Sequence, residues 1–224
     1  MRYGLPAPLC KFFASLALLL SLSAAPFAAN AANDRLTIVA LGDSLTAGYM
    51  LGPDEGFTHQ LEKALRDAGH ENVTVVNAGV SGDTSSGGLA RLDWAVGPEA
   101  DAVIVELGAN DALRAIDPAL TRKNLSEIVS RLKDRGLPVL LAGMLAPPNL
   151  GRDYGESFNS IYPDLAESEG LILYPFFLDG VAGERRLNLA DGIHPTAEGI
   201  GVIVERILPK VKMLIAEARE RKGG

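Results

Sequence analysis

From Leu36 onward, short apolar runs alternate with longer stretches in which apolar residues recur every three or four positions. A short apolar run bounded by turn residues is typical of a buried strand, and the longer spacing is typical of an amphipathic helix. The runs predict five strands, over residues 36–41, 73–76, 103–107, 139–141 and 171–174.

Helices are predicted between and after these strands, and turn residues mark several of their ends. The spacing predicts helices over residues 58–68, 84–95, 121–135, 154–168 and 197–218. Thr84 is a candidate N-cap, and Gly69 and Gly136 are C-terminal signals. Pro163 interrupts the fourth helix and Pro209 is expected to kink or divide the last one, because proline lacks the N–H that a helix needs.

Strands that alternate with helices imply βαβ units with right-handed crossovers. We therefore predict an α/β fold of the flavodoxin-like kind, a three-layer α/β/α sandwich with a mostly parallel five-stranded sheet. The chain has 224 residues, 47% of them hydrophobic, which is enough to bury a sizeable core without disulfides or metals. No repeat or low-complexity linker divides it, so residues 32–224 are expected to form a single domain.

Residues 1–31 follow a different pattern. They begin with the charges Arg2 and Lys11, continue with an apolar core over about residues 12–22, and offer small residues for cleavage at 29–31. This three-part pattern predicts a secretory signal peptide. The alternative is an uncleaved membrane anchor, against which the shortness of the apolar core argues. We therefore expect a periplasmic or secreted protein with no stable membrane insertion after signal cleavage.

Charge and motif content exclude several function classes. The formal net charge of −7 becomes −9 without Arg2 and Lys11, and such an acidic chain has no electrostatic reason to bind nucleic acid or anionic membranes. Cys10, the only cysteine, precedes the apolar core, so the mature chain would contain none and would need no disulfide in an oxidising compartment. The absence of HExxH, cysteine clusters, GxGxxG and P-loop motifs gives no reason to expect a metal or a cofactor.

The first predicted strand ends in Gly42-Asp43-Ser44, after which a helical pattern resumes. Open parallel sheets place their chemistry at the carboxyl ends of strands, where loops meet helix N-termini. Ser44 therefore stands where a nucleophile is expected. The alternative is that Ser44 only caps the following helix, and this stretch alone leaves both interpretations open.

A nucleophilic serine needs a base and a third group that orients the base. His59 and His70 fall at the start of a helix and after a helix-ending glycine, positions that favour surface roles. His194 lies three residues after Asp191, immediately before the last helix, so one imidazole nitrogen can meet the carboxylate while the other faces outward. The alternative is that Asp191 only organises the turn and His194 packs nearby.

Two further loops offer donors for the oxyanion that forms when an ester carbonyl is attacked. Gly82 follows the second strand and could supply its backbone N–H, and Asn110 follows the third strand and could supply its side-chain amide. The alternatives are a turn glycine and an Asx-turn. The neighbouring Asp43 and Asp111 are interpreted as residues that organise their loops.

Taken together, these loops resemble the four sequence blocks of the SGNH, or GDSL, hydrolase family. The blocks are matched in order by Gly42-Asp43-Ser44-Leu45, by Gly82 within residues 80–84, by Gly108-Ala109-Asn110-Asp111 and by Asp191-Gly192-Ile193-His194. The resemblance extends over about residues 36–208 and is nearest to the bacterial exported branch with multifunctional acyl thioesterase/lysophospholipases and arylesterases.

The resemblance implies roles for five residues. It makes Ser44 the nucleophile, His194 the general base and acid, and Asp191 the partner that orients His194. It assigns the oxyanion hole to the Ser44 N–H, the Gly82 N–H and the Asn110 side chain.

Apolar residues on two loops are expected to line a groove beside the serine. They are Leu113, after the third strand, and Met144, Leu145 and Pro147, after the fourth. The alternative is that these residues are ordinary core, since apolar loop residues are common.

The sequence thus predicts a monomeric, exported serine esterase that needs no cofactor and hydrolyses a small-molecule acyl ester or thioester with an apolar acyl group. A carbohydrate or peptidoglycan O-deacetylase is the alternative enzyme, because the same residues support it. An exported binding domain without turnover is the non-enzymatic alternative.

Overall fold

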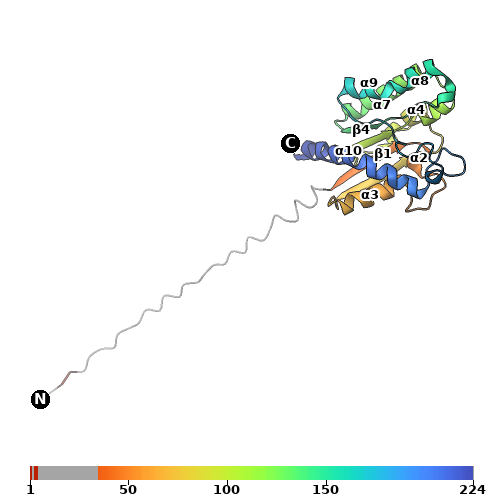
Figure 1. Ribbon diagram of the computed structural model, residues 1–224. Coiled ribbons are helices and arrows are strands. Elements are labelled where there is room, and N and C mark those ends of the chain that lie inside the picture. Colours follow the sequence, from red (N-terminus) through yellow and green to blue (C-terminus); the bar gives the residue numbers. More distant parts are fainter. Residues whose placement is uncertain (2, 5–34, 224) are drawn as a thin grey trace.

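The computed structural model describes residues 1, 3–4 and 35–223 (Figure 1). Five strands form one sheet in the order β2-β1-β3-β4-β5, and every neighbouring pair is parallel. Their bounds are Leu36–Gly42 (β1), Val73–Gly79 (β2), Ala102–Glu106 (β3), Val139–Ala142 (β4) and Ile172–Tyr174 (β5). All five predicted strands are present, and the predicted α/β class and parallel sheet are confirmed.

Helices cover both faces of this sheet. Figure 1 shows α3 and α10 on one side and α4, α7, α8 and α9 on the other, which is the predicted three-layer arrangement. The α-helices are Ser44–Ala47 (α2), Phe57–Asp67 (α3), Ser85–Ala90 (α4), Leu92–Ala95 (α5), Ala109–Leu113 (α6), Pro118–Asp134 (α7), Arg152–Asn159 (α8), Ile161–Glu169 (α9) and Ala197–Gly223 (α10). Two 3₁₀ turns span Pro148–Leu150 (η1) and Arg185–Leu187 (η2).

Two predicted helices are each divided into two. The helix expected over residues 84–95 is divided into α4 and α5, because Arg91 leaves helical geometry between them. Its predicted N-cap is confirmed, since the Thr84 hydroxyl accepts a hydrogen bond from the Gly87 N–H. The break between α8 and α9 falls at Ser160, three residues before the proline expected to cause it. Pro163 instead lies in the first turn of α9, where a missing N–H leaves no hydrogen bond unmade.

The last helix is longer than expected and is not divided. The prediction that Pro209 divides it was wrong, because α10 runs without a break through that position to its end. Burial on both sides of the proline explains why one lost hydrogen bond is tolerated. The buried residues of this face are Ile200, Ile203, Val204, Ile207, Val211, Leu214, Ile215 and Ala218.

The register of the strands decides where the loops begin. Every residue of β3 and β4 is buried, as are all but one of β1, so these central strands are covered on both faces and appear in the sequence as continuous apolar runs. Gly42 at the end of β1 is paired with Gly79 of β2 and with Glu106 of β3. The loops after β1, β2 and β3 therefore start side by side at one edge of the sheet.

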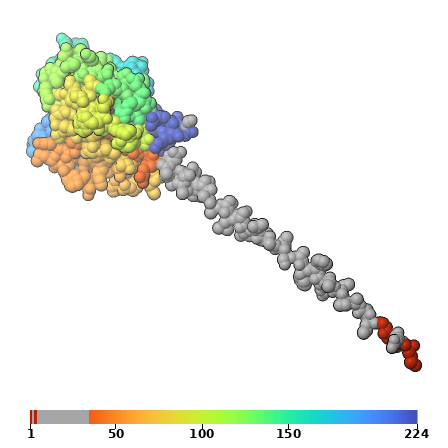
Figure 2. All heavy atoms as spheres, turned by 180° about the vertical axis from the view of Figure 1, so that it is seen from behind, coloured from red at the N-terminus to blue at the C-terminus, as the bar shows by residue number. Residues whose placement is uncertain are grey.

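The two ends of residues 35–223 also lie side by side, at the edge where the strands begin. The Lys222 ammonium in α10 donates a hydrogen bond of 2.6 Å to the Arg35 carbonyl, and Figure 2 shows the end of α10 next to the start of β1. The signal peptide predicted over residues 1–31, Cys10 included, lies outside the described residues apart from 1 and 3–4. None of the helices that the structure describes has the length and apolar character needed to cross a membrane.

Candidate active site

Ser44 is the first residue of the short helix α2, directly after β1. At Gly42 a Cβ atom would lie 2.1 Å from the Thr46 hydroxyl, so only glycine allows this close turn. The N-cap is Asp43, whose Oδ1 accepts a hydrogen bond of 3.0 Å from the Leu45 N–H. The alternative that Ser44 serves as the cap is therefore wrong, and its hydroxyl group is available for other contacts.

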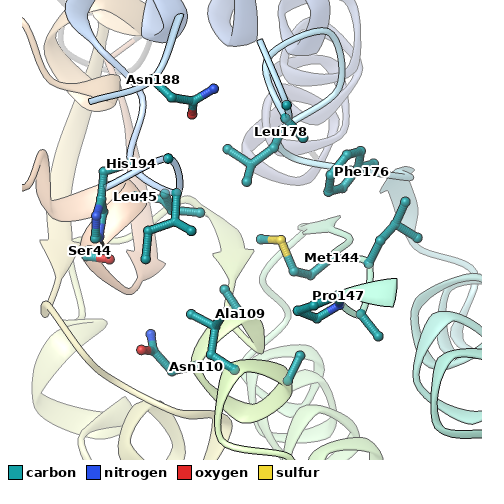
Figure 3. A pocket seen from close by; sticks show the side chains of 18 of the residues that line it. Ser44, Leu45, Ala109, Asn110, Met144, Pro147, Phe176, Leu178, Asn188 and His194 are labelled. Atoms are coloured by element: carbon teal, nitrogen blue, oxygen red, sulfur yellow. Dashed lines mark hydrogen bonds between the residues drawn. The ribbon is translucent and has the colours of Figure 1, made fainter. Parts of the chain in front are cut away.

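Ser44, His194 and Asp191 form a continuous hydrogen-bonded chain (Figure 3 labels the first two). His194 Nε2 lies 2.9 Å from Ser44 Oγ, and His194 Nδ1 lies 2.7 Å from Asp191 Oδ2. The other carboxylate oxygen, Asp191 Oδ1, accepts hydrogen bonds from the N–H groups of Ile193 and His194. Asp191 thus holds both the turn and the imidazole ring, and Nε2 is left to accept the serine proton.

The hydrogen bonds to Asp191 also keep it ionised. Donation by the Ile193 N–H is the largest cause, and donation by the His194 ring and N–H adds to it, so that the pKa of Asp191 falls to about 2. The carboxylate is therefore negatively charged at any pH at which the protein would work, and it can stabilise a positive charge on the imidazole.

Tyr49 forms a second contact to the same imidazole. Its ring centroid lies 4.5 Å from that of His194, with an angle of 36° between the ring planes. Gly48 ends α2 in the left-handed conformation and turns the chain so that Tyr49 follows directly. This contact could not be predicted from the sequence, because nothing in the spacing of Tyr49 distinguishes it from an ordinary loop tyrosine.

Asn110 lies in the first turn of α6, directly after β3. Its side-chain amide donates a hydrogen bond of 3.0 Å to Asp43 Oδ2, so the loops after β1 and β3 meet. Gly108 has φ of +117°, and a Cβ there would lie 2.1 Å from the hydroxyl of the buried Tyr162. That hydroxyl donates a hydrogen bond of 2.8 Å to the Leu107 carbonyl and fixes the start of the loop.

Gly82 lies on the loop after β2, with φ of +84°. Its carbonyl accepts a hydrogen bond of 2.8 Å from Arg114, and no acceptor among residues 35–223 is bonded to its N–H. The following residue, Asp83, pairs with the buried Arg91, which also donates to the Gly42 carbonyl. Arg91, which the sequence analysis did not identify, therefore ties the Gly82 loop to the strand that carries Ser44.

Asp111 has the contacts of a residue that organises its loop. Its buried carboxylate accepts hydrogen bonds from the N–H and hydroxyl of Ser85, at 2.7 and 2.5 Å, and from the Thr121 hydroxyl, at 3.0 Å. It therefore joins the loop after β3 to the beginning of α4 and to α7.

Two buried carboxyl groups lie behind the serine. Glu106 Oε2 accepts hydrogen bonds from the Thr46 hydroxyl (2.8 Å) and the Asp43 N–H (3.3 Å), whereas Glu106 Oε1 is buried and has no partner among the described residues. Burial raises the pKa of Glu106 well above its ordinary value and that of Asp43 to about 6. Glu106 was not predicted as a site residue, although an acidic residue inside the apolar run 103–107 is a sequence feature that could have indicated it.

A cavity of about 370 Å³ opens beside Ser44, with Asn110 and His194 also in its wall (Figure 3). The remaining lining is mostly apolar and includes the four residues expected there, Leu113, Met144, Leu145 and Pro147. Met144 is buried, whereas Leu113 and Leu145 are exposed at the rim.

The structure brings these four apolar residues together with Ser44, Asn110 and His194 in one cavity wall. Gly82 is not among the described residues that line the cavity. Phe176, Leu178, Asn188 and Ile193 are also among the lining residues, and none of these four was predicted to line it.

No group of three or more potential metal ligands occurs among the described residues. What the arrangement offers is a hydroxyl group, an imidazole, a carboxylate and several N–H donors at the mouth of an apolar cavity. These are the parts that acyl transfer through a serine requires.

Comparison with known proteins agrees with this chemistry. Residues 40–200 match the GDSL-like Lipase/Acylhydrolase family. Esterase TesA of Pseudomonas aeruginosa is 41% identical over 180 residues, which cover 80% of this chain and 89% of that protein. An arylesterase of Vibrio mimicus is 41% identical over 179 residues, covering 80% and 88%. The thioesterase 1/protease 1/lysophospholipase L1 of Escherichia coli is 36% identical over 180 residues, covering 80% and 85%.

The fold has solved counterparts as well. A crystal structure of TesA superposes with a TM-score of 0.75 at 41% identity, and the match covers 80% of this chain and 99% of that one. The likeness therefore extends over nearly the whole of that structure.

Proposed function

This chain belongs to the GDSL-like lipase/acylhydrolase family and is a hydrolase of ester bonds, and from that premise we propose that it is a serine esterase acting through an acyl-enzyme on Ser44. The observation that carries the proposal is the hydrogen-bonded chain from Ser44 Oγ through the His194 ring to the Asp191 carboxylate. His194 Nε2 lies 2.9 Å from Ser44 Oγ, which is close enough for the imidazole to take the serine proton during attack. The ionised Asp191 lies 2.7 Å from His194 Nδ1 and can stabilise the imidazolium that forms.

In the proposed mechanism, Ser44 Oγ attacks the acyl carbonyl carbon while His194 Nε2 takes the hydroxyl proton. The tetrahedral intermediate collapses when His194 returns that proton to the leaving alcohol or thiol, which departs and leaves an ester on Ser44. Water then attacks this ester with His194 again as base, and the carboxylic acid is released as Ser44 regains its proton. Asp191 holds the ring and stabilises the imidazolium at both stages.

The oxyanion of each intermediate needs preorganised donors. We assign this role to the N–H groups of Ser44 and Gly82 and to the Asn110 amide. The Ser44 N–H lies in the first turn of α2, where a helix leaves N–H groups without partners, and Asn110 Nδ2 keeps a second hydrogen after donating to Asp43. These free donors support the assignment.

The substrate is proposed to be an acyl ester or thioester with an apolar acyl group. The cavity beside Ser44 has the size and the mostly apolar lining of a small-molecule site. Leu113, Met144, Leu145 and Pro147 are assigned to contact with the substrate. The relatives are named esterase, arylesterase and thioesterase/lysophospholipase, which supports the same class of substrates for this chain.

The test is a hydrolysis profile measured beside the Ser44→Ala variant. Aryl esters from acetyl to dodecanoyl, acyl-coenzyme A thioesters and a lysophospholipid are compared with release of acetate from acetylated polysaccharide. We expect kcat/KM to rise beyond the acetyl ester and to vanish in the variant. Activity confined to acetyl groups, with acetate released from the polysaccharide, would instead establish an O-deacetylase.

We propose that residues 1–31 direct export and that residues 32–224 act as a single monomeric hydrolase domain in the periplasm or outside the cell. The charged start, the short apolar core and the small residues at 29–31 support this proposal. N-terminal sequencing of the protein recovered from a periplasmic extract should begin near residue 32, and light scattering should give the mass of one chain. Recovery of the uncleaved chain from membranes would contradict export by a cleaved signal peptide.

A further inference from the structure

Asn188 introduces a polar group into the apolar part of the cavity. Ser44, Asn110 and His194 lie together at the end where the ester bond is cleaved. Apart from these three, Asn188 is the only polar side chain among the described residues that line the cavity, and the wall across from it includes Phe176 and Leu178 (Figure 3).

Two hydrogen bonds fix the orientation of the Asn188 amide. Nδ2 donates to the carbonyl oxygens of Val181, at 2.7 Å, and Glu184, at 3.0 Å. Both partners are acceptors only, so the nitrogen must face them and both of its hydrogens are used. The opposite orientation would bring the amide oxygen against two carbonyl oxygens. Oδ1 is therefore held on the other side of the amide group.

Asn188 Oδ1 points into the cavity in Figure 3. It accepts no hydrogen bond from residues 35–223, and it is not one of the fully buried polar atoms of these residues, so it is accessible from the cavity although Asn188 as a whole is only 8% exposed. An amide oxygen that faces the cavity and receives no donor from the protein is matched by a ligand that brings one, whereas an aliphatic residue would serve a pure hydrocarbon ligand better. The oxygen therefore indicates a ligand that brings a hydrogen-bond donor to this place.

The surroundings decide which donor fits. No aspartate or glutamate lies among the described residues of the cavity wall, so nothing there compensates the positive charge of an ammonium group. A neutral hydroxyl group, with apolar carbons on either side of it, matches one amide oxygen within an apolar wall. The segment that holds Asn188 also reaches the active site, because the Leu189 N–H donates to the His194 carbonyl at 2.7 Å.

We propose that Asn188 is a specificity-determining residue whose Oδ1 accepts a hydrogen bond from a hydroxyl group on the part of the ester that fills the cavity. This inference rests on the proposed esterase function and makes its substrate class narrower, namely hydroxylated esters. The hydroxyl group belongs either to the acyl chain or to the alcohol, and the two sources are distinguished by substrate series that vary one half at a time.

The experiment compares matched substrates with the unaltered protein. One series contains esters of a saturated acid and of the same acid with a hydroxyl or a methoxy group at successive carbons. The other varies the alcohol half in the same way. At the matching position we expect the hydroxylated ester to exceed both the plain and the methoxylated ester about tenfold in kcat/KM, because a methoxy group cannot donate. The series that shows the preference identifies the half that carries the hydroxyl group.

The Asn188→Leu variant tests the residue itself, and Leu178→Met is the matched change in the same wall. Asn188→Leu should reduce the ratio of kcat/KM for the hydroxylated ester to kcat/KM for the plain ester to about one. Leu178→Met should keep the preference even if the absolute rates change.

Equal kcat/KM for hydroxylated and plain esters in both series would overturn the inference and leave the esterase function intact. Persistence of the preference in Asn188→Leu would overturn the role of Asn188, and failure to hydrolyse any ester would overturn both proposals. Because Asn188→Leu also removes two hydrogen bonds to the backbone and can impair folding, the substrate series with the unaltered protein decides the question by itself.

Discussion

The Asn110 side-chain amide donates a hydrogen bond of 3.0 Å to the Asp43 carboxylate, which joins the loops after two neighbouring strands. The same carboxylate caps the helix that begins with Ser44, by accepting from the Leu45 N–H. Asp43 therefore positions the proposed nucleophile and the proposed oxyanion donor together. Because one hydrogen of the Asn110 amide is held in this way, the amide plane is fixed and the second hydrogen has a defined direction.

Asn110→Ala should lower kcat about a hundred- to a thousandfold, because it removes one donor to the oxyanion. KM should change little, since the oxyanion exists in the transition state and not in the bound ester. Steady-state kinetics on an aryl ester measures both constants. Near-full kcat in this variant would show that Asn110 does not serve the oxyanion.

Asp43→Asn tests whether Asp43 positions that amide. An asparagine can still cap α2 through its oxygen, but its NH₂ group would then face the Asn110 donor, and we expect kcat to fall about tenfold or more. Asp117→Asn is the matched control, because Asp117 caps α7 in the same way through the Ala119 N–H and lies outside the cavity wall. Unchanged kcat in Asp43→Asn, with the control also unchanged, would show that the bond between Asp43 and Asn110 has no part in turnover.

Substitutions of His194 and of Asp191 should lower kcat by different amounts. By analogy with serine proteases, His194→Ala should lower kcat on the order of a millionfold and Asp191→Asn roughly ten-thousandfold, since an asparagine can hold the turn but cannot stabilise the imidazolium. The exposed Asp54–His59 pair provides the control, because Asp54→Asn changes an aspartate–histidine contact outside the proposed active site. Equal activities of Asp191→Asn and Asp54→Asn would contradict the assignment of Asp191.

Glu106→Gln should change the pH dependence of stability. Burial raises the pKa of Glu106, so above its unfolded value of 4.5 the unfolded chain releases a proton that the folded protein retains. The free energy of unfolding of the wild type should therefore fall relative to Glu106→Gln as the pH rises from 4.5, by up to about 1.4 kcal/mol per pH unit. Urea unfolding at pH 5 and pH 8 measures the difference, with the exposed Glu167→Gln as control. A difference that is the same at both pH values would contradict a protonated Glu106.

The sheet could be predicted from the sequence because its central strands are buried on both faces, where only apolar residues are tolerated. Because neighbouring strands are parallel, their carboxyl ends lie at one edge of the sheet, and this places Ser44 and Asn110 in the wall of one cavity. The short separation of Asp191 and His194 made their contact predictable as well, since one tight turn brings the two side chains together.

Other features depend on contacts between distant parts of the chain, which a local pattern does not encode. Arg91 looks like a solvated helix residue, yet its guanidinium lies buried against the Gly42 carbonyl, 49 residues away. Pro209 predicts a helix break, and the packing of α10 against the sheet overrides that local preference. Asn188 is an ordinary loop asparagine until the structure shows its oxygen facing the cavity.

The central claim is that Ser44 carries the acyl group, and covalent labelling tests it most directly. The protein is incubated with an aryl alkylphosphonate, whose phosphorus takes the place of the acyl carbon, and the modified residue is identified by peptide mass spectrometry. We predict one phosphonyl group per chain, on Ser44, with loss of esterase activity in proportion to labelling and no label in Ser44→Ala. Complete inhibition with the phosphonyl group on another residue, or full esterase activity in Ser44→Ala, would contradict the account.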